Sequence, residues 1–220
     1  MSRYRRSSYT PTSYKTADVF AAACAAHRAN CGYLKIGATD DEGEVIRLPN
    51  KIIIRQFLDL SFDIRDEDRE LSKKVIQFCQ SLTFKLLADR KLSDFEKNIL
   101  KIVEKETIDS NYDIAIISSL PAAYFRKNDR MINDARINEA TGFIGKVGDK
   151  IKFTIEVLRC NYSENWQTYF ITAITPDDKV VFFAYRERLE VGANINGEGK
   201  VKSHRNERED STQLNYVKVL

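Results

Sequence analysis

The segment IKFTIEVLRC, residues 151–160, opens the part of the chain that decides the fold. Apolar and polar side chains alternate along much of it, which is typical of a strand with one face in a core. Four more strand-like segments follow at residues 168–175, 180–185, 196–202 and 213–220, separated by turn-forming residues or charged loops. Five short strands in this order predict a small Greek-key barrel over residues 141–220.

Among barrels of this description the OB-fold is the commonest, and its open face binds single-stranded nucleic acid. The upstream residues predict helices instead. Residues 17–30 are rich in alanine, the best helix former, and Ser93 with Glu96 forms a capping box before residues 94–107. Further helical patterns cover residues 51–60, 66–89 and 112–120. The predicted fold class is therefore α+β, with a helical domain over residues 17–140 followed by a five-stranded OB-like β-barrel.

Residues 1–16 are expected to form a basic disordered arm, since they contain Arg3, Arg5, Arg6 and Lys15 and no acidic residue. Such an arm either grips a nucleic-acid backbone or is a solvated terminus. No apolar run approaches the roughly 18–20 residues that span a bilayer, and no signal peptide is visible. We therefore expect a cytoplasmic protein (in the host cytoplasm, if a phage encodes it) without a membrane partner.

Metal and cofactor sites are not expected. The four cysteines form no C-x-x-C pair, and with two histidines in the chain no zinc ligand set closes. The sequence also lacks a Gly-rich phosphate loop, H-E-x-x-H and G-x-S-x-G. Three consecutive acids, Asp66, Glu67 and Asp68, are explained by the start of a helix, although a metal-dependent nuclease remains a rival interpretation. We expect no catalytic residue.

The barrel region resembles a known module. Its opening, Gly142-Phe-Ile-Gly-Lys-Val-Gly-Asp-Lys-Ile151, and the later stretches 171–183, 199–204 and 212–219 are similar to OB-like single-stranded DNA-binding modules of phage proteins. The resemblance covers about the last third of the chain and departs at residues 161–166, where a glycine is expected in the turn. It implies a role in replication, recombination or repair, with replication or transcription proteins as further partners.

Binding of a single strand needs aromatic rings that stack on bases and basic side chains that follow the phosphates. The same rings can instead fill the barrel, and core is the favoured place for Phe170, Phe182 and Phe183; a lysine stripe can instead protect a sheet edge. Trp166, in a polar loop, is the strongest stacking candidate. The candidate contacts are Tyr162, Trp166, Tyr169, Phe183 and Tyr185 for stacking, and Lys152, Lys200, Lys202, His204 and Arg205 for phosphates.

The sequence therefore predicts a non-catalytic protein that binds single-stranded nucleic acid, with DNA favoured. The alternative is a protein–protein adaptor, such as an inhibitor or subunit of a polymerase, nuclease or defence complex. The oligomeric state and the choice between DNA and RNA stay open at this level, because neither follows from composition.

Overall fold

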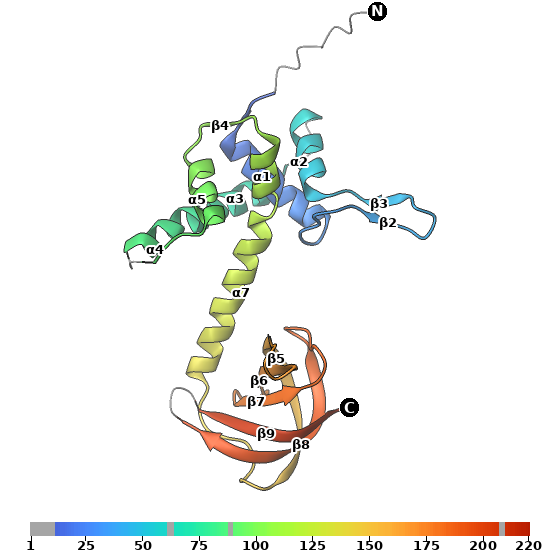
Figure 1. Ribbon diagram of the computed structural model, residues 1–220, viewed down its shortest axis with the longest axis vertical. Coiled ribbons are helices and arrows are strands. Elements are labelled where there is room, and N and C mark those ends of the chain that lie inside the picture. Colours follow the sequence, from blue (N-terminus) through green and yellow to red (C-terminus); the bar gives the residue numbers. More distant parts are fainter. Residues whose placement is uncertain (1–11, 61–63, 88–89, 207–209) are drawn as a thin grey trace, which may run out of the picture. The chain divides into compact units, whose positions relative to one another are not determined.

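The computed structural model describes residues 12–60, 64–87, 90–206 and 210–220 (Figure 1). Its fold class is the expected one: helices dominate the N-terminal half and a closed five-stranded barrel forms the C-terminal part. The chain divides into two compact units, Met1–Lys127 and Asn128–Leu220. In the described part of the chain, no helix has both the length and the apolar character needed to cross a membrane.

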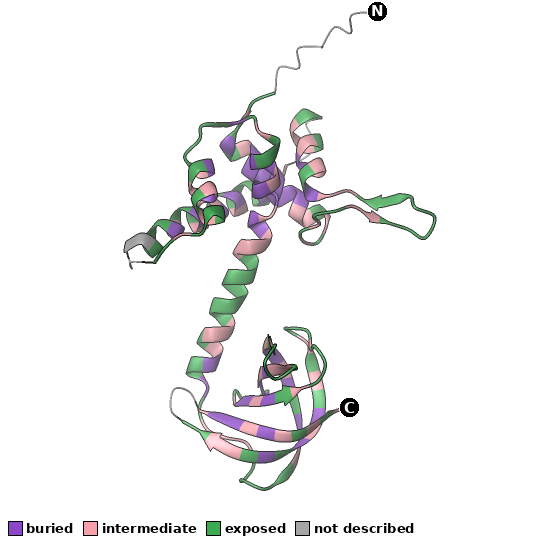
Figure 2. Ribbon diagram, in the orientation of Figure 1, coloured by how far each residue is buried: buried purple, intermediate pink, exposed green. Residues whose placement is uncertain are grey.

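The helical unit is built around α1 (Thr16–Ala29), which is largely purple in Figure 2. Every residue from Val19 to Ala26 is buried, so this helix is apolar on all sides, as expected for the central helix of a core. Its alanines let neighbouring helices approach closely. The neighbours are α2 (Asn50–Asp59) and α3 (Asp66–Gln80), and Ile54, Val75 and Cys79 fill the contacts between them.

The expected helix over residues 66–89 is interrupted. After α3 the chain forms a 3₁₀ turn, Ser81–Thr83, and then the short helix α4, Phe84–Leu87. Three further helices follow in the described part of the chain: α5 (Asp94–Val103), α6 (Asn111–Ile117) and α7 (Leu120–Glu139). The strands β2 (Ala38–Thr39) and β3 (Val45–Arg47) form a hairpin between α1 and α2.

The last residues of the expected N-terminal arm are folded. Tyr14–Lys15 forms strand β1, which pairs with β4, Thr107–Ile108, so these residues belong to the folded helical unit. Thr16 begins α1, and its hydroxyl donates to the carbonyl oxygen of Lys105 at 2.5 Å. Arg3, Arg5 and Arg6 lie outside the described residues.

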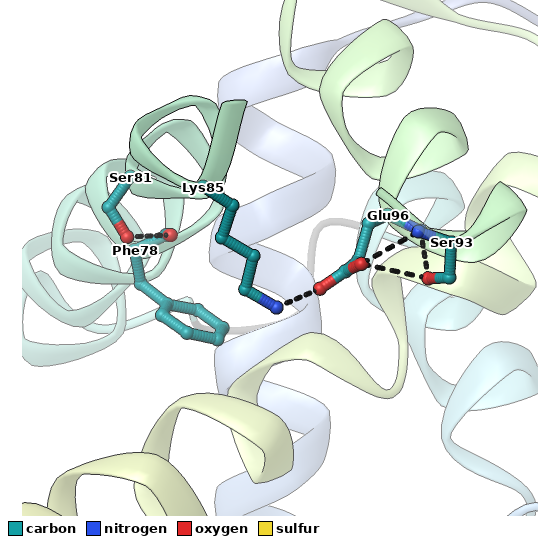
Figure 3. A network of polar contacts seen from close by, with 5 residues as sticks. All are labelled: Phe78, Ser81, Lys85, Ser93 and Glu96. Atoms are coloured by element: carbon teal, nitrogen blue, oxygen red, sulfur yellow. Dashed lines mark hydrogen bonds and ion pairs between the residues drawn. The ribbon is translucent and has the colours of Figure 1, made fainter. Parts of the chain in front are cut away.

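The predicted capping box at α5 is confirmed (Figure 3). The backbone N–H of Glu96 donates to Ser93 Oγ at 3.3 Å, and Glu96 Oε2 accepts from the Ser93 backbone N–H at 2.9 Å. The other carboxylate oxygen of Glu96 pairs with Lys85 of α4. The hydrogen bond from Lys85, together with the cap, lowers the pKa of Glu96 to about 2. Glu96 thus connects two helices as well as capping one.

The barrel consists of β5 (Lys150–Ser163), β6 (Thr168–Ile174), β7 (Val180–Tyr185), β8 (Asn194–Arg205) and β9 (Ser211–Val219). Around the barrel the order is β5-β6-β7-β9-β8, and β8 pairs with β5 to close it. All pairs are antiparallel except β7 with β9. This five-stranded Greek-key order is that of an OB-like barrel.

Two glycines shape the barrel core. A Cβ on Gly197 would lie 2.7 Å from the ring of Phe153, and one on Gly199 would lie 3.5 Å from it. The bare backbone of β8 therefore makes room for the Phe153 side chain, which packs with Phe183 at 6.3 Å between ring centroids. Ile155, Val157, Ile171, Ala173, Val181, Val201 and Leu214 complete this core.

The last turns of α7 belong to the barrel unit, although the sequence placed them in the helical domain. Ile137 and Ala140 are buried against Leu158, Ile174 and Val180 on the outer side of the barrel. Two ion pairs fasten the same contact. Arg136 donates to both carboxylate oxygens of Glu156 at 3.0 and 2.7 Å, and Arg159 pairs with Asp134 at 2.7 Å.

Candidate nucleic-acid interface

Three of the predicted stacking residues form one row across the barrel. Cross-strand register places Tyr162 opposite Tyr169, and Tyr169 opposite Tyr185. The Tyr162 and Tyr169 rings lie 5.0 Å apart between centroids. Tyr169 and Tyr185 are half-buried against the core, whereas Tyr162 is 49% exposed. The accessible end of this row is therefore Tyr162.

Phe183 is fully buried in the barrel core, so its assignment as a base-stacking residue is wrong. Strand alternation explains the error. Val181, Phe183 and Tyr185 all point inward, and the sequence pattern alone does not say which of the two faces of β7 is the inner one.

Phe170 and Phe182 lie on the outer face of β6 and β7, where the sequence had favoured a core position for both. Their rings stack with centroids 5.8 Å apart and an interplanar angle of 8°. The guanidinium of Arg205 lies over the Phe182 ring, 5.4 Å from its centroid. We call these three residues the aromatic face. It joins a predicted phosphate contact to two aromatic rings that the core does not use.

Arg205 is held in place by β9. Its Nη2 donates to Gln213 Oε1 at 2.8 Å, and Ser203 Oγ contacts the same oxygen at 3.2 Å. The cation over an aromatic ring resembles the arrangement in which arginine and aromatic side chains together bind bases and phosphates.

The loop between β5 and β6 carries Trp166, which is 74% exposed. The sequence lacks the glycine expected here, and Gln167 instead takes the left-handed conformation with φ 49°. The side chain of Gln167 closes the loop: its Oε1 accepts from the Tyr162 hydroxyl at 3.0 Å, and its Nε2 donates to the Glu164 carbonyl at 2.9 Å. A formed loop therefore presents Trp166 to solvent.

The structure brings Lys152 and Lys200 together. They line a groove of about 610 Å³ on the outside of β5, β8 and β9. Lys202 is exposed farther along β8, outside the residues that line the groove. Edge protection does not explain these lysines, because β8 pairs with β5 on one side and β9 on the other. The groove is lined by Lys150, Ile151, Lys152, Glu198, Gly199, Lys200 and Tyr216.

His204 does not continue the lysine stripe. A register shift between Val201 and Ser203 inserts Lys202 as an extra residue, and this shift reverses the alternation. His204 lies opposite the buried Thr212, stacks on Phe143 with 4.4 Å between ring centroids, and keeps Nε2 buried without a partner among the described residues. In this conformation Nε2 of His204 is not accessible to a phosphate.

Tyr216 is the accessible residue that the sequence reasoning missed. Its side chain is 85% exposed, the largest exposure of any large hydrophobic residue in the described part of the chain. One signal was available in the sequence. Leu214 and Val217 are three residues apart, where strict alternation requires two or four, and this spacing indicates a β-bulge.

Asp68, a candidate metal ligand in the rival nuclease interpretation, already accepts hydrogen bonds within the helical unit. Its carboxylate accepts from Arg28 Nε at 3.0 Å, from Arg28 Nη2 at 2.7 Å and from the Arg65 backbone N–H at 3.1 Å. In the described ranges, no three His, Cys, Asp or Glu side chains gather as metal ligands would.

Burial raises the pKa of the Cys24 and Cys79 thiols to about 12, so both are protonated at neutral pH.

No family model matches this chain, and searches of curated proteins and of solved structures find no match to it.

Proposed function

We propose that this chain is a non-catalytic protein that binds single-stranded nucleic acid, with DNA as the favoured partner. The carrying observation is the aromatic face: the stacked pair Phe170 and Phe182 on the outside of β6 and β7, with Arg205 over one ring. The second and third strands of an OB-fold are those whose face binds oligonucleotides, and β6 and β7 hold those positions here.

The physical argument rests on where the aromatic surface lies. The barrel fills its interior with Phe153, Phe183 and aliphatic residues, and Phe170 and Phe182 lie half-buried outside that core. Aromatic rings held outside a core and next to a fixed cation suit base stacking with a phosphate contact. Trp166, at the end of the β5–β6 hairpin, supplies another exposed ring. The role in phage-like replication, recombination or repair rests on the sequence resemblance.

The test is fluorescence anisotropy of a labelled oligothymidine across a salt series. Stacking contributes about 1–3 kcal/mol per base, so Phe182→Ala and Trp166→Ala are each expected to weaken binding about 5- to 150-fold. Tyr112→Ala, which removes an exposed ring from the helical unit, is the matched control and is expected to leave the affinity unchanged. Absence of binding by the wild-type chain at low salt contradicts the proposal.

A second candidate function, protein docking, is favoured by the hairpin of β2 and β3. Val45 and Ile46 are exposed there, as is Ile36 just before it. Exposed apolar residues of this kind are typical of protein contacts. Partner binding that resists salt and is lost in Ile46→Asp, with oligothymidine binding absent, would replace the first proposal by this one.

A further inference from the structure

The groove on β5, β8 and β9 contains a strained backbone position. Tyr216 has φ 54°, in the left-handed region that L-residues with bulky side chains rarely adopt. The strain has a clear structural origin. While β8 advances from Glu198 to Lys200, its partners on β9 run from Lys218 to Asn215, so β9 carries one extra residue and forms a bulge.

Glycine is the usual residue at the left-handed position of such a bulge. Here a tyrosine occupies it, and its ring gains no burial in exchange, since the side chain is 85% exposed. Strained conformations of this kind cluster at ligand-binding sites, where the bulge re-aims a side chain. The ring of Tyr216 is aimed out of the barrel beside the groove that it helps to line.

The lysines of the groove provide a second, independent observation. Lys150 and Lys200 are direct cross-strand partners, an arrangement of like charges that destabilises a sheet. Neither they nor Lys152 form an ion pair with any described residue. Glu198, the single acid that lines the groove, lies between Lys152 and Lys218 in the sheet. The groove therefore keeps an excess of positive charge that an anion would neutralise.

The groove and the aromatic face lie on different sides of the closed barrel, and β9 connects them. Phe182 on β7 lies opposite Gln213 on β9, and Lys200 on β8 lies opposite Asn215 on the same strand β9. Two of the five inter-strand steps around the closed barrel separate β7 from β8, and β9 is the strand between them. One continuous strand of nucleic acid can therefore contact both surfaces by wrapping around the outside of β9.

We infer that the groove is a second contact surface for the same bound strand: Lys150, Lys152 and Lys200 hold its phosphates and Tyr216 stacks on one of its bases. This inference rests on the proposed function and adds to it. It makes the binding site a path that begins on the aromatic face, crosses β9 and ends at the β5–β8 pair. The occluded site is accordingly longer than the aromatic face alone requires.

Anisotropy with oligothymidines of about 4 and about 16 nucleotides, the range of site sizes for OB-folds, tests this path. Tyr216→Gly is expected to weaken binding of the longer strand about 5- to 150-fold and to leave binding of the shorter strand nearly unchanged. The double variant Lys150→Gln/Lys200→Gln is expected to reduce the slope of log K against log salt by about 1.4, since each phosphate contact contributes about 0.7.

Lys35→Gln/Lys51→Gln, in the helical unit, removes the same charge and is the matched control. Wild-type affinity and salt slope in both groove variants, with the longer strand still bound through Phe182, would overturn the groove and leave the proposed function standing. Failure of the wild-type chain to bind either strand would overturn both. If the groove variants lose binding while Phe182→Ala binds as tightly as the wild type, the groove is a contact surface and the aromatic face is not.

Discussion

Tyr216 combines a backbone conformation that favours glycine with a large, exposed side chain. The backbone dihedral favours glycine, whereas the ring extends from the barrel into solvent. A left-handed conformation costs about 1–2 kcal/mol for a residue with a Cβ. Glycine would remove that strain but lose about 0.5–1 kcal/mol through its greater freedom in the unfolded chain.

Tyr216→Gly is therefore expected to leave the free energy of unfolding unchanged or to raise it by at most about 1.5 kcal/mol, because the released strain offsets or exceeds the entropic loss. Urea denaturation of the wild-type and variant chains measures this difference. A destabilisation above about 1 kcal/mol would show that the ring packs against the barrel, and it would remove strain as an argument for ligand binding.

Among the elements, α4 and α5 are joined by the Lys85–Glu96 pair at the α5 cap (Figure 3). Because the folded-state pKa of Glu96 is lowered from 4.5 to about 2, the contact stabilises the fold fully above about pH 4.5. The stabilisation is lost as the pH falls from 4.5 towards 2, because the carboxylate then becomes protonated in the folded state as well.

Glu96→Gln is expected to lower the free energy of unfolding by at most about 1 kcal/mol at pH 7, the usual range for a partly exposed pair. The difference from wild type should shrink as the pH falls below about 4.5. Urea midpoints of the wild-type and Glu96→Gln chains, measured from pH 7 to pH 2, give this difference in stability. Glu70→Gln, at the exposed pair with Lys73, is the control, and a difference that stays constant across this range would contradict the assignment.

For the whole molecule, the division into two units is decided by α7. Its last turns and the next residue pack on the barrel through Ile137 and Ala140, and its ion pairs reach Glu156 and Arg159 of β5. The expected boundary near residue 140 follows the change from helix to strand, whereas packing groups residues 128–220 together. A unit of structure need not end where the type of secondary structure changes.

Ile137→Ala is expected to destabilise the barrel unit by about 2–5 kcal/mol, the usual cost of removing a buried isoleucine side chain. Hydrogen exchange of the barrel amides reports the opening of this unit. Ile132→Ala on the same helix is the matched control, because Ile132 is 51% exposed. Equal stability of the two variants would show that the end of α7 does not stabilise the barrel.

The sequence by itself determined the features that depend on neighbouring residues. Alternation located all five barrel strands to within a few residues, alanine content located α1, and the Ser93–Glu96 spacing gave the α5 cap. These signals are local, because periodicity and capping act over one or two turns or pleats. They were sufficient for the α+β class and for the OB-like barrel.

Tertiary structure alone decided which residues meet and which face is outside. Alternation divides β7 into two faces, but only barrel closure puts Phe183 inside and Phe182 outside. Lys150 and Lys200 become neighbours through the β5–β8 register, fifty positions apart in the chain. A bulge changes which face of the sheet the following side chains occupy. The bulge on β8 takes His204 out of the predicted lysine stripe, and the bulge on β9 exposes Tyr216. The physical reason is that register and closure depend on the packing of distant strands, which no local pattern encodes.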